Sequence, residues 1–474
     1  MSLPVHESSP LPSDGSTSPA RSLWTRFKHV SGVDRAIGFT VLARGWSTAG
    51  GVVTVLLIAR FLNLAEQGYY YTFASLVALQ IVFELGFSFV ILQLAAHERA
   101  KLTILPSFQL TGDPVAHSRL ASVLQKSVRW YSAAGLCMAL SLLPAGFYFF
   151  STHQQGTSHV PWKLPWVFVV LAATFTFQMD PVCSFLEGCG FVADVAHMRF
   201  LQSILGNLLA WSALMLHHGL FAPAMVIMGQ AIVAGVFLFS KRRLLLPLLA
   251  KKAGVDVIGW RSEILPFQWR IAVSWLCGYF IFQIFNPVLF AYQGAAVAGR
   301  MGMSLSIVSA LSAVALSWMS TKAAPFGVMI AHRDFAGLDR VFFRALIQST
   351  ILLASGAITL LTAILLIEHR WQSLAHRVLA PWAIALLLAT SILNHIVFAE
   401  AVYLRAHKKE PFLIQSILVG ILTGSSTIIT GRLWGATGVT IGYFLTSGIF
   451  GVTLATSIFI ARRREWHADP APAG

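Results

Sequence analysis

Residues 345–367 read ALIQSTILLASGAITLLTAILLI, a run of 23 residues without a charged side chain. A helix that crosses the hydrocarbon core of a bilayer needs about 20 predominantly apolar residues, so this run is long enough to span a membrane. Comparable runs recur along the whole 474-residue chain, and they predict an all-α polytopic membrane protein with about twelve transmembrane helices. The expected spans are 36–61, 69–94, 129–150, 165–186, 197–216, 221–240, 265–291, 296–319, 342–367, 379–403, 412–430 and 437–461.

The composition excludes a soluble globular protein. Hydrophobic residues make up 56% of the chain and charged residues only 11%, with a mean hydropathy of +0.70. A soluble domain carries about 25% charged residues because its surface must face water. Most of the surface of this chain is therefore expected to face lipid.

The distribution of basic residues predicts which side of the membrane each loop occupies. The net charge of +15 comes from clusters between the apolar runs, at Arg21–Arg35, Arg99–Lys101, Lys241–Arg243, Arg405–Lys409 and Arg462–Arg464. With the N-terminus inside, 26 of the 34 Lys and Arg residues fall in inner segments and 6 in outer ones. Basic loops stay in the cytoplasm, so both termini are expected there. The scattered clusters do not form the basic patch of a nucleic-acid-binding protein.

The chain is expected to divide into two lobes of six helices each. The expected parts are a partly disordered cytoplasmic tail at 1–35, an N-lobe at 36–240, a basic cytoplasmic linker at 241–263, a C-lobe at 264–461 and a cytoplasmic tail at 462–474. Two triplets repeat at an offset of 226 residues, namely Arg44, Gln67 and Gly68, and Arg270, Gln293 and Gly294. This offset suggests that the lobes are parallel repeats, a plan in which transporters place the substrate between the halves.

Ionisable residues inside the expected spans are candidates for function, because a charge in hydrocarbon costs about 2.5 kcal/mol or more. They are Arg44, Glu84, Asp180, Arg270 and Glu400. At about 1.5 Å per residue all five lie in the inner half of the membrane. They predict a polar chamber that opens to the cytoplasm, with arginines for an anionic headgroup and acids for ion coupling. The alternative is that they pair with one another and fix helix packing, as Arg44 and Glu84 would at similar depth.

Prolines inside the expected spans are candidates for kinks or hinges. Pro181 follows Asp180, and Asn286 precedes Pro287 in the seventh span. Proline removes a backbone hydrogen bond, which is tolerated where a helix bends or lines a cavity. A static kink and a gating hinge both fit this pattern.

Three stretches resemble bacterial polysaccharide-biosynthesis membrane proteins. They are EQGYYYTFASLVALQIVFELGFSFVILQLAAHE at 66–98, LPFQWRIAVSWLCGYFIFQIFNPVLFAYQG at 265–294 with AGRMGMSLSI at 298–307, and YLRAHKKEPF at 403–412. That family belongs to the multidrug/oligosaccharidyl-lipid/polysaccharide (MOP) exporter superfamily, whose O-antigen flippases have two six-helix lobes. The resemblance implies a multi-pass protein of the bacterial inner membrane. It would flip an undecaprenyl-diphosphate-linked oligosaccharide, or export a polysaccharide precursor, by alternating access coupled to an ion gradient.

The resemblance also implies roles for single residues. By this analogy Arg44 and Arg270 cradle the diphosphate, and Glu84 or Asp180 takes up a proton. Arg300 stands in the AGRMGMS motif, where many members of the family carry glutamine. Its positive charge at the outer face would favour an acidic glycan.

Two other functions remain open on the sequence. One is a drug or small-molecule efflux antiporter of the same superfamily. The other is a membrane glycosyltransferase or polymerase, which the short expected outer loops disfavour. The sequence contains no nucleotide-binding loop, metal-ligand motif or nucleophile–base pair, so no enzymatic activity, metal or cofactor is expected. The expected partners of this monomer are the lipid-linked oligosaccharide, membrane lipids, and a polysaccharide polymerase or glycosyltransferases, without nucleic acid.

Overall fold

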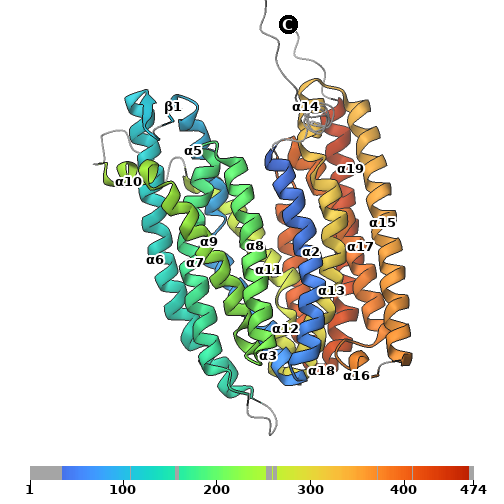
Figure 1. The fold of residues 1–474 in the computed structure, drawn as a ribbon. Coiled ribbons are helices and arrows are strands. Elements are labelled where there is room, and N and C mark those ends of the chain that lie inside the picture. The colour runs from blue at the N-terminus through green and yellow to red at the C-terminus, as the bar shows by residue number, and fades with distance from the viewer. Residues whose placement is uncertain are drawn as a thin grey trace, which may run out of the picture.

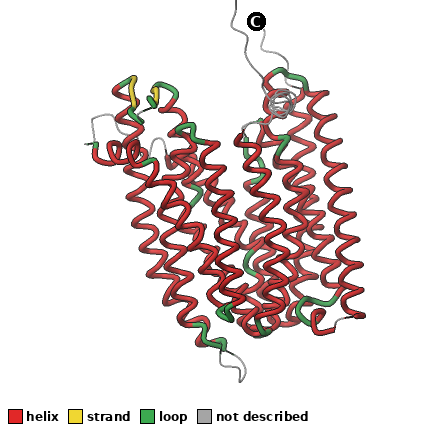
Figure 2. Tube along the Cα trace, in the orientation of Figure 1, coloured by secondary structure: helices red, strands yellow, loops and turns green. Residues whose placement is uncertain are grey.

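The computed structural model describes residues 35–468 apart from 107, 155–159, 252–258, 260–263, 371 and 408. Residues 1–34 of the expected N-terminal tail, residues 252–258 and 260–263 of the expected linker and the last six residues lie outside the described part of the chain. Figure 2 shows that the described chain is almost entirely helical, with one short β-hairpin at one end.

The N-lobe contains the helices from α2 to α9, and α10 follows it at one end (Figure 1). Its helices are α2 (Arg35–Phe61), α3 (Leu64–Val77), α4 (Ile81–Glu84), α5 (Phe87–Arg99), α6 (Pro114–Thr152), α7 (Lys163–Gly188), α8 (Val192–Met215), α9 (Ala222–Ser240) and α10 (Arg242–Ala250), with 3-10 turns at Ala78–Gln80 and Gly219–Phe221. Strands β1 (Leu102–Ile104) and β2 (Leu110–Gly112) pair antiparallel between α5 and α6.

The C-lobe contains the helices from α11 to α19. They are α11 (Leu265–Phe282), α12 (Phe285–Gln293), α13 (Ala295–Ser320), α14 (Ala323–Ala331), α15 (Phe335–Arg370), α16 (Gln372–Ala375), α17 (Pro381–Ala406), α18 (Leu413–Leu445) and α19 (Thr453–Ala468), with a π-helical segment at Thr446–Val452. In Figure 1 β1, α10 and α14 lie at the same end of the molecule as the C-terminus. Because the basic loops lie at this end, we call it the inner end.

Eight helices of the described chain are each long and apolar enough to cross a membrane, and two more spans result if each bent helix pair is one span. These pairs bend by 45° between Leu64–Glu84 and Phe87–Arg99, and by 43° between Ala272–Phe282 and Phe285–Gln293. Helix α8 has 24 residues and at about 1.5 Å per residue also reaches across a bilayer. The longest of the eight, at Leu413–Ala468, needs separate treatment because its 56 residues exceed one span.

This longest run turns back on itself at Gly435. The backbone of Gly435 has φ 60° and ψ −143°, a non-helical conformation that glycine adopts without a Cβ clash. Two contacts join the arms in antiparallel register: Thr423 Oγ1 lies 3.3 Å from Thr446 Oγ1, and Gln415 Nε2 donates to the Gly451 carbonyl over 3.3 Å. The run is therefore a hairpin of two spans. The described chain thus has twelve spans in two lobes, which confirms the predicted fold class.

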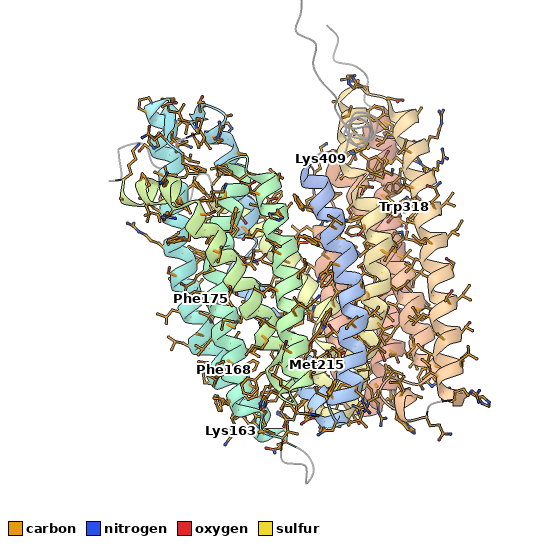
Figure 3. All side chains as sticks on the ribbon, viewed as in Figure 1. Lys163, Phe168, Phe175, Met215, Trp318 and Lys409 are labelled. Atoms are coloured by element: carbon orange, nitrogen blue, oxygen red, sulfur yellow. The ribbon has the colours of Figure 1, made fainter. Side chains whose placement is uncertain are left out.

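The outer surface of the helices is apolar between two charged ends. Phe168 and Phe175 on α7 are 42% and 53% exposed. Lys163 lies at the outer end of the molecule and Lys409 near the inner end (Figure 3). An apolar band between polar rims is what a bilayer requires of a spanning protein, so the chain is a multi-pass membrane protein.

Two tryptophans fix α2 against α8 within the N-lobe. Trp46 Nε1 donates to the Ser203 carbonyl over 3.2 Å, and Trp211 Nε1 donates to Thr54 Oγ1 over 2.8 Å. In each pair the two bonded residues are 157 positions apart in the sequence. Because this separation is the same for both pairs, α2 and α8 run parallel to each other. With this side of α2 packed on its own lobe, Arg44 reaches the C-lobe.

The backbones of the two lobes come very close at the outer end, where α3 crosses α13. Gly68 and Gly299 are the fifth residues of these helices. A Cβ on Gly299 would lie 2.8 Å from the Gly68 nitrogen, and a Cβ on Gly68 would overlap the Ala295 carbonyl. Equivalent positions of the lobes are therefore 231 residues apart at this crossing. The predicted 226-residue offset is wrong here, because it paired Gly68 with Gly294, which precedes α13.

Hydrogen bonds close the same crossing. Gln67 Nε2 donates to the carbonyls of Gly299 and Arg377 over 2.8 and 2.9 Å, and Arg377 Nη1 donates to the Leu62 carbonyl. Burial lowers the pKa of the Arg377 guanidinium, while the charge of Glu66 opposes that shift. We call these contacts, with the Gly68–Gly299 crossing, the outer junction. In Figure 1 the two groups of helices converge toward this end and diverge toward the inner end.

Candidate functional site

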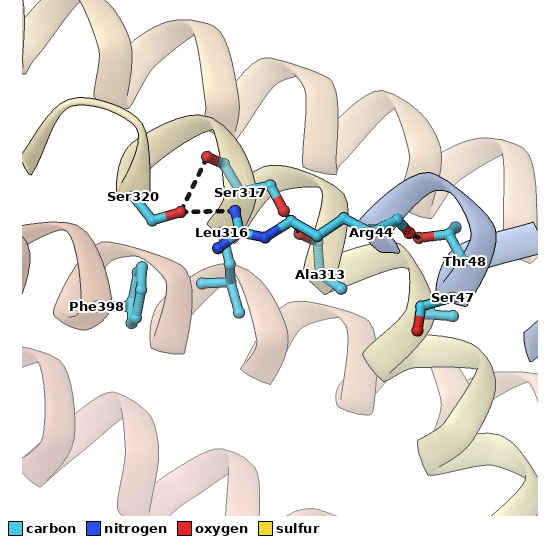
Figure 4. A pocket seen from close by; sticks show the side chains of 9 residues that line it. Arg44, Ser47, Thr48, Ala313, Leu316, Ser317, Ser320 and Phe398 are labelled. Atoms are coloured by element: carbon cyan, nitrogen blue, oxygen red, sulfur yellow. Dashed lines mark hydrogen bonds between the residues drawn. The ribbon is translucent and has the colours of Figure 1, made fainter. Parts of the chain in front are cut away.

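A pocket containing Arg44 lies where α2 of the N-lobe meets α13 and α17 of the C-lobe. Its volume is about 320 Å³, and its lining residues are Arg44, Ser47, Thr48, Ala310, Ala313, Leu316, Ser317, Ser320 and Phe398. Figure 4 shows the Arg44 side chain extending from α2 to α13, where Nη1 donates to Ser320 Oγ over 2.9 Å. The pocket is thus a contact between the lobes as well as a cavity.

The Arg44 pocket has the chemistry of an anion site. A guanidinium carries five N–H donors in one plane, and the hydrogen bond to Ser320 uses one of them. Thr48 and Ser320 donate to carbonyls of their own helices over 3.0 Å each, and both hydroxyls can rotate toward an oxygen in the pocket. Among the nine described lining residues none is acidic, so nothing in the lining neutralises Arg44.

Glu84 does not pair with Arg44, so that alternative from the sequence is wrong. Glu84 is the last residue of α4, and its carboxyl group lies near the Ser88 side chain. The next two residues, Leu85 and Gly86, have φ values of 51° and 67°, which break the helix directly after the acid. Arg44 and Glu84 therefore do not meet although they lie at similar depth. The helix break after Glu84 directs its side chain toward the interior of the N-lobe.

Glu84 belongs to a polar cluster inside the N-lobe. Ser88 Oγ lies 2.7 Å from the Tyr131 hydroxyl, and the Asp180 carboxyl lies within electrostatic range of Glu84 and Arg199. Two acids thus share one site beside a broken helix, an arrangement in which transporters bind coupling ions. Ser88 and Tyr131 were missed in the sequence, where the only signal was the Gly that follows Leu85.

Glu400 lies apart from both sites. It is only 3% exposed and accepts a 2.8 Å hydrogen bond from Thr456 Oγ1 on α19. The described acids and Arg44 therefore have different partners, and the common chamber that the sequence predicts stays a prediction. Helix depth gives the height of a residue in the membrane but not the direction in which its side chain points.

Neither of the other two predicted arginines is among the described residues that line the Arg44 pocket. Arg270 belongs to α11, and its side chain lies outside the described part of the chain. Arg300 is half-buried in the second turn of α13. It is 20 residues from Ser320, or about 30 Å along the helix. A role for Arg300 in glycan selection at the outer face stays a prediction.

The two predicted kink positions, Pro181 and Asn286–Pro287, differ from each other in the structure. Helix α7 runs without interruption through Pro181. The seventh span bends by 43° just before Asn286 and Pro287, and Asn286 Nδ2 donates to Ser75 Oγ of the N-lobe over 3.0 Å. Asn286 therefore joins the two lobes. That it acts as a hinge stays a prediction.

Serines and a threonine of the pocket were not singled out in the sequence. Ser317 and Ser320 are spaced three residues apart and so share one face of α13, and Ser47 and Thr48 follow Arg44 by one turn of α2. Such spacing is common in membrane helices, where small polar residues usually serve helix packing. Only the contact between α2 and α13 distinguishes these four hydroxyls from the others.

The geometry defines the class of protein: two six-helix membrane lobes that meet at their outer ends, with an arginine pocket where α2 of one contacts α13 of the other. No family model matches the sequence, and a search of curated proteins finds no match. Solved structures, however, match over most of the chain.

The matching structures are membrane transporters of low sequence identity. The lipid II flippase MurJ in an inward closed conformation is 13% identical, with a TM-score of 0.59, covering 90% of each chain. The MATE multidrug transporter DinF-BH is 13% identical with a TM-score of 0.59, covering 92% of this chain and 97% of its own. An inward-facing MATE family transporter of the MOP superfamily is 15% identical with a TM-score of 0.53, covering 88% and 99%. The protein therefore has the fold of MOP-superfamily transporters.

Proposed function

We propose that the protein is a transporter of the bacterial inner membrane that flips a lipid-linked oligosaccharide, or exports a polysaccharide precursor, with an undecaprenyl diphosphate anchor. The observation that carries the proposal is the Arg44 pocket. It combines an unneutralised guanidinium with four hydroxyls at a contact between the lobes. Arginine binds two phosphate oxygens at once through parallel N–H donors, so a diphosphate headgroup suits the pocket.

The position of the pocket supports alternating access. Ser320 is the last residue of α13 at the inner end, and Gly299 lies near its outer end. With the outer junction formed, the pocket is reached from the cytoplasmic side. When the lobes rotate and the junction opens, the same pocket is reached from the outer side, because its walls come from both lobes. No bond of the substrate is made or broken in this cycle, so the protein acts as a carrier and not as an enzyme.

The acids of the N-lobe would couple this cycle to a proton gradient. Glu84 and Asp180 are close enough to interact, and two carboxylates in one site favour the uptake of a proton. Glu84 lies directly beside the break in the second span. Protonation would therefore act where the backbone is already bent.

A second candidate function is efflux of small molecules, because the MATE structures that match in fold are multidrug transporters. The observation that favours it is the same Glu84–Asp180 cluster, which could bind a cation directly. The two functions differ in the charge of the substrate. A diphosphate needs Arg44, whereas a lipophilic cation would be repelled by it.

Transport in proteoliposomes tests the proposal. The purified protein is reconstituted, and the movement of a fluorescent undecaprenyl-diphosphate-linked sugar is measured beside that of a lipophilic cationic dye. The proposal expects transport of the diphosphate lipid and a loss of at least about tenfold in Arg44→Gln, because hydrogen bonds to charged groups contribute about 1.5–3 kcal/mol. Arg60→Gln is the matched control, since Arg60 lies on the same helix outside the pocket.

The outcomes separate the two functions. Transport of the dye but not of the diphosphate lipid would establish efflux and overturn the flippase proposal. Transport of the lipid at an equal rate in Arg44→Gln would leave a flippase whose headgroup site lies elsewhere.

A further inference from the structure

A second cavity lies between α13 and α15 on the C-lobe. Its volume is about 480 Å³, and its lining residues are Leu311, Val314, Ala315, Leu352, Leu353, Ser355, Gly356, Thr359, Leu360 and Ala363. The two hydroxyls among them are turned to their own helix, because Ser355 Oγ donates to the Leu352 carbonyl and Thr359 Oγ1 to the Ser355 carbonyl, each over 2.9 Å. The cavity therefore presents an apolar wall, and we call it the α13–α15 groove.

Close packing at Gly356 forms the floor of the groove. A Cβ on Gly356 would lie 2.5 Å from a methyl carbon of Leu311, so α15 approaches α13 at this point without a side chain between them. The neighbouring Ser355 and Thr359 are exposed. The groove is thus open on the lipid side and closed toward the interior of the lobe.

The groove and the Arg44 pocket flank the same stretch of α13. Ala313 lines the Arg44 pocket and Val314 lines the groove, although they are successive residues that point about 100° apart. Both are exposed, while Ala315, at the inner side of the groove, is buried. Trp318, 43% exposed, lies one turn further toward the inner end (Figure 3). The two cavities therefore lie on either side of the exposed ridge of α13, at the same height.

We propose that the α13–α15 groove binds the hydrocarbon chain of the lipid whose anionic headgroup occupies the Arg44 pocket, so that one lipid lies across the exposed side of α13. This inference rests on the proposed function and assigns a binding place to the apolar chain of its substrate. The polarity of the two cavities supports it: the Arg44 pocket is cationic and hydroxyl-lined, and the groove is apolar. Its volume also falls in the range of about 300–1,000 Å³ that is usual for ligand sites.

The arrangement has a consequence for how the substrate moves. A chain held on the lipid side of α13 stays in the bilayer while only the headgroup enters the space between the lobes. The C-lobe would then carry both ends of the lipid, because α13 borders both cavities. A water-soluble molecule with the same headgroup would use half of this site.

Filling the groove tests the inference. In Ser355→Trp/Thr359→Trp two indoles occupy the cavity, and Thr362→Trp is the matched control. Thr362 is an exposed threonine of the same helix, its hydroxyl also donates to its own helix, and it lies outside the groove. The substrates are the undecaprenyl-diphosphate-linked sugar and the same sugar on a two-isoprene diphosphate. We expect transport of the long-chain lipid to fall at least tenfold in the double variant and to stay within twofold for the short-chain analogue.

The control variant should transport both substrates within twofold of the wild type. Equal losses for both chain lengths, or no loss for the long chain, would overturn the groove inference while leaving a flippase in place. A wild-type protein that transports neither substrate would overturn the proposed function and the groove inference together.

Photochemical cross-linking covers the case in which the double variant does not fold. The wild-type protein is illuminated with an undecaprenyl diphosphate lipid that carries a diazirine at the chain end. The inference expects labelling concentrated at residues 352–363 and lost on addition of excess unlabelled lipid. Labelling spread over the lipid-facing helices and unaffected by competitor would mean contact with bulk lipid only, and would overturn it.

Discussion

A single methyl group at the outer junction should shift the equilibrium between the two orientations of the transporter. Gly68 on α3 packs against the first residues of α13 so closely that a Cβ would lie 2.5 Å from the Ala295 carbonyl carbon. Ordinary van der Waals contact begins at 3.4 Å. The substitution Gly68→Ala therefore requires a separation of about 0.9 Å at this atom, and more at the carbonyl oxygen. Both partners are helix backbone, so neither can rotate away.

The size of the effect follows from the cost of overpacking. Inserting a methyl group into a well-packed contact costs about 1–3 kcal/mol. The cost falls only on the state in which the outer junction is closed, because the helices separate in the other state. A differential cost of that size changes the ratio of the two states about 5- to 150-fold. Gly68→Ala should therefore enrich the conformation that is open to the outer side.

Distances between spin labels on the two lobes measure this shift. One label replaces Lys163, which is exposed at the outer end (Figure 3). The other replaces the exposed Arg370, the last residue of α15, directly before α16 at the same end (Figure 1). The pair reports the separation there after the exposed Cys137 is replaced by serine. Gly51→Ala is the matched control, since a Cβ on Gly51 meets nothing within 4 Å. We expect a longer-distance population in Gly68→Ala and an unchanged distribution in Gly51→Ala.

Two results would refute the reasoning. An unchanged distribution in Gly68→Ala would mean that the crossing of α3 and α13 is not where the lobes separate. An equal change in Gly51→Ala would mean that any added methyl group perturbs the bundle, with no special role for the outer junction.

Three further predictions follow from the contacts described above. Arg377→Ala removes the hydrogen bond to the Leu62 carbonyl and should lengthen the same spin-label distances; equal distances would mean that the bond contributes nothing to closure. Glu84→Gln should abolish the response of the flip rate to an imposed proton gradient while lipid binding persists, and a retained response would exclude this acid from coupling. Asp339→Ala removes hydrogen bonds from Tyr403 and Arg463 and should lower the free energy of unfolding by about 1–3 kcal/mol. Glu465→Ala, at an exposed ion pair, should cost less than about 0.5 kcal/mol, as measured by thermal unfolding in detergent.

The spans could be predicted from the sequence because hydropathy depends only on composition and length. The expected span 165–186 lies within α7, Lys163–Gly188. The two last spans were separated correctly although α18 continues through Gly435, since glycines interrupt the apolar run there. These features are local, and a window of about 20 residues contains all the information they need.

The site could be predicted only in part, because it depends on which helices are neighbours. Arg44 falls inside the candidate span Leu42–Phe61, as expected, but its partner Ser320 is 276 residues away. The sequence left open a pairing of Glu84 with Arg44, yet the left-handed backbone at Leu85 and Gly86 directs Glu84 elsewhere. A left-handed leucine is a product of tertiary packing and leaves no clear pattern in the sequence.

The measurement that tests the central claim most directly compares two lipids that differ only in headgroup charge. The wild-type protein in proteoliposomes is given an undecaprenyl chain with a diphosphate-linked sugar, and the same chain with the sugar on an uncharged linker. Because Arg44 is the recognition element, the charged lipid should cross at least tenfold faster. Equal rates for the two lipids would contradict the account, because the pocket between the lobes would then not recognise the anionic headgroup.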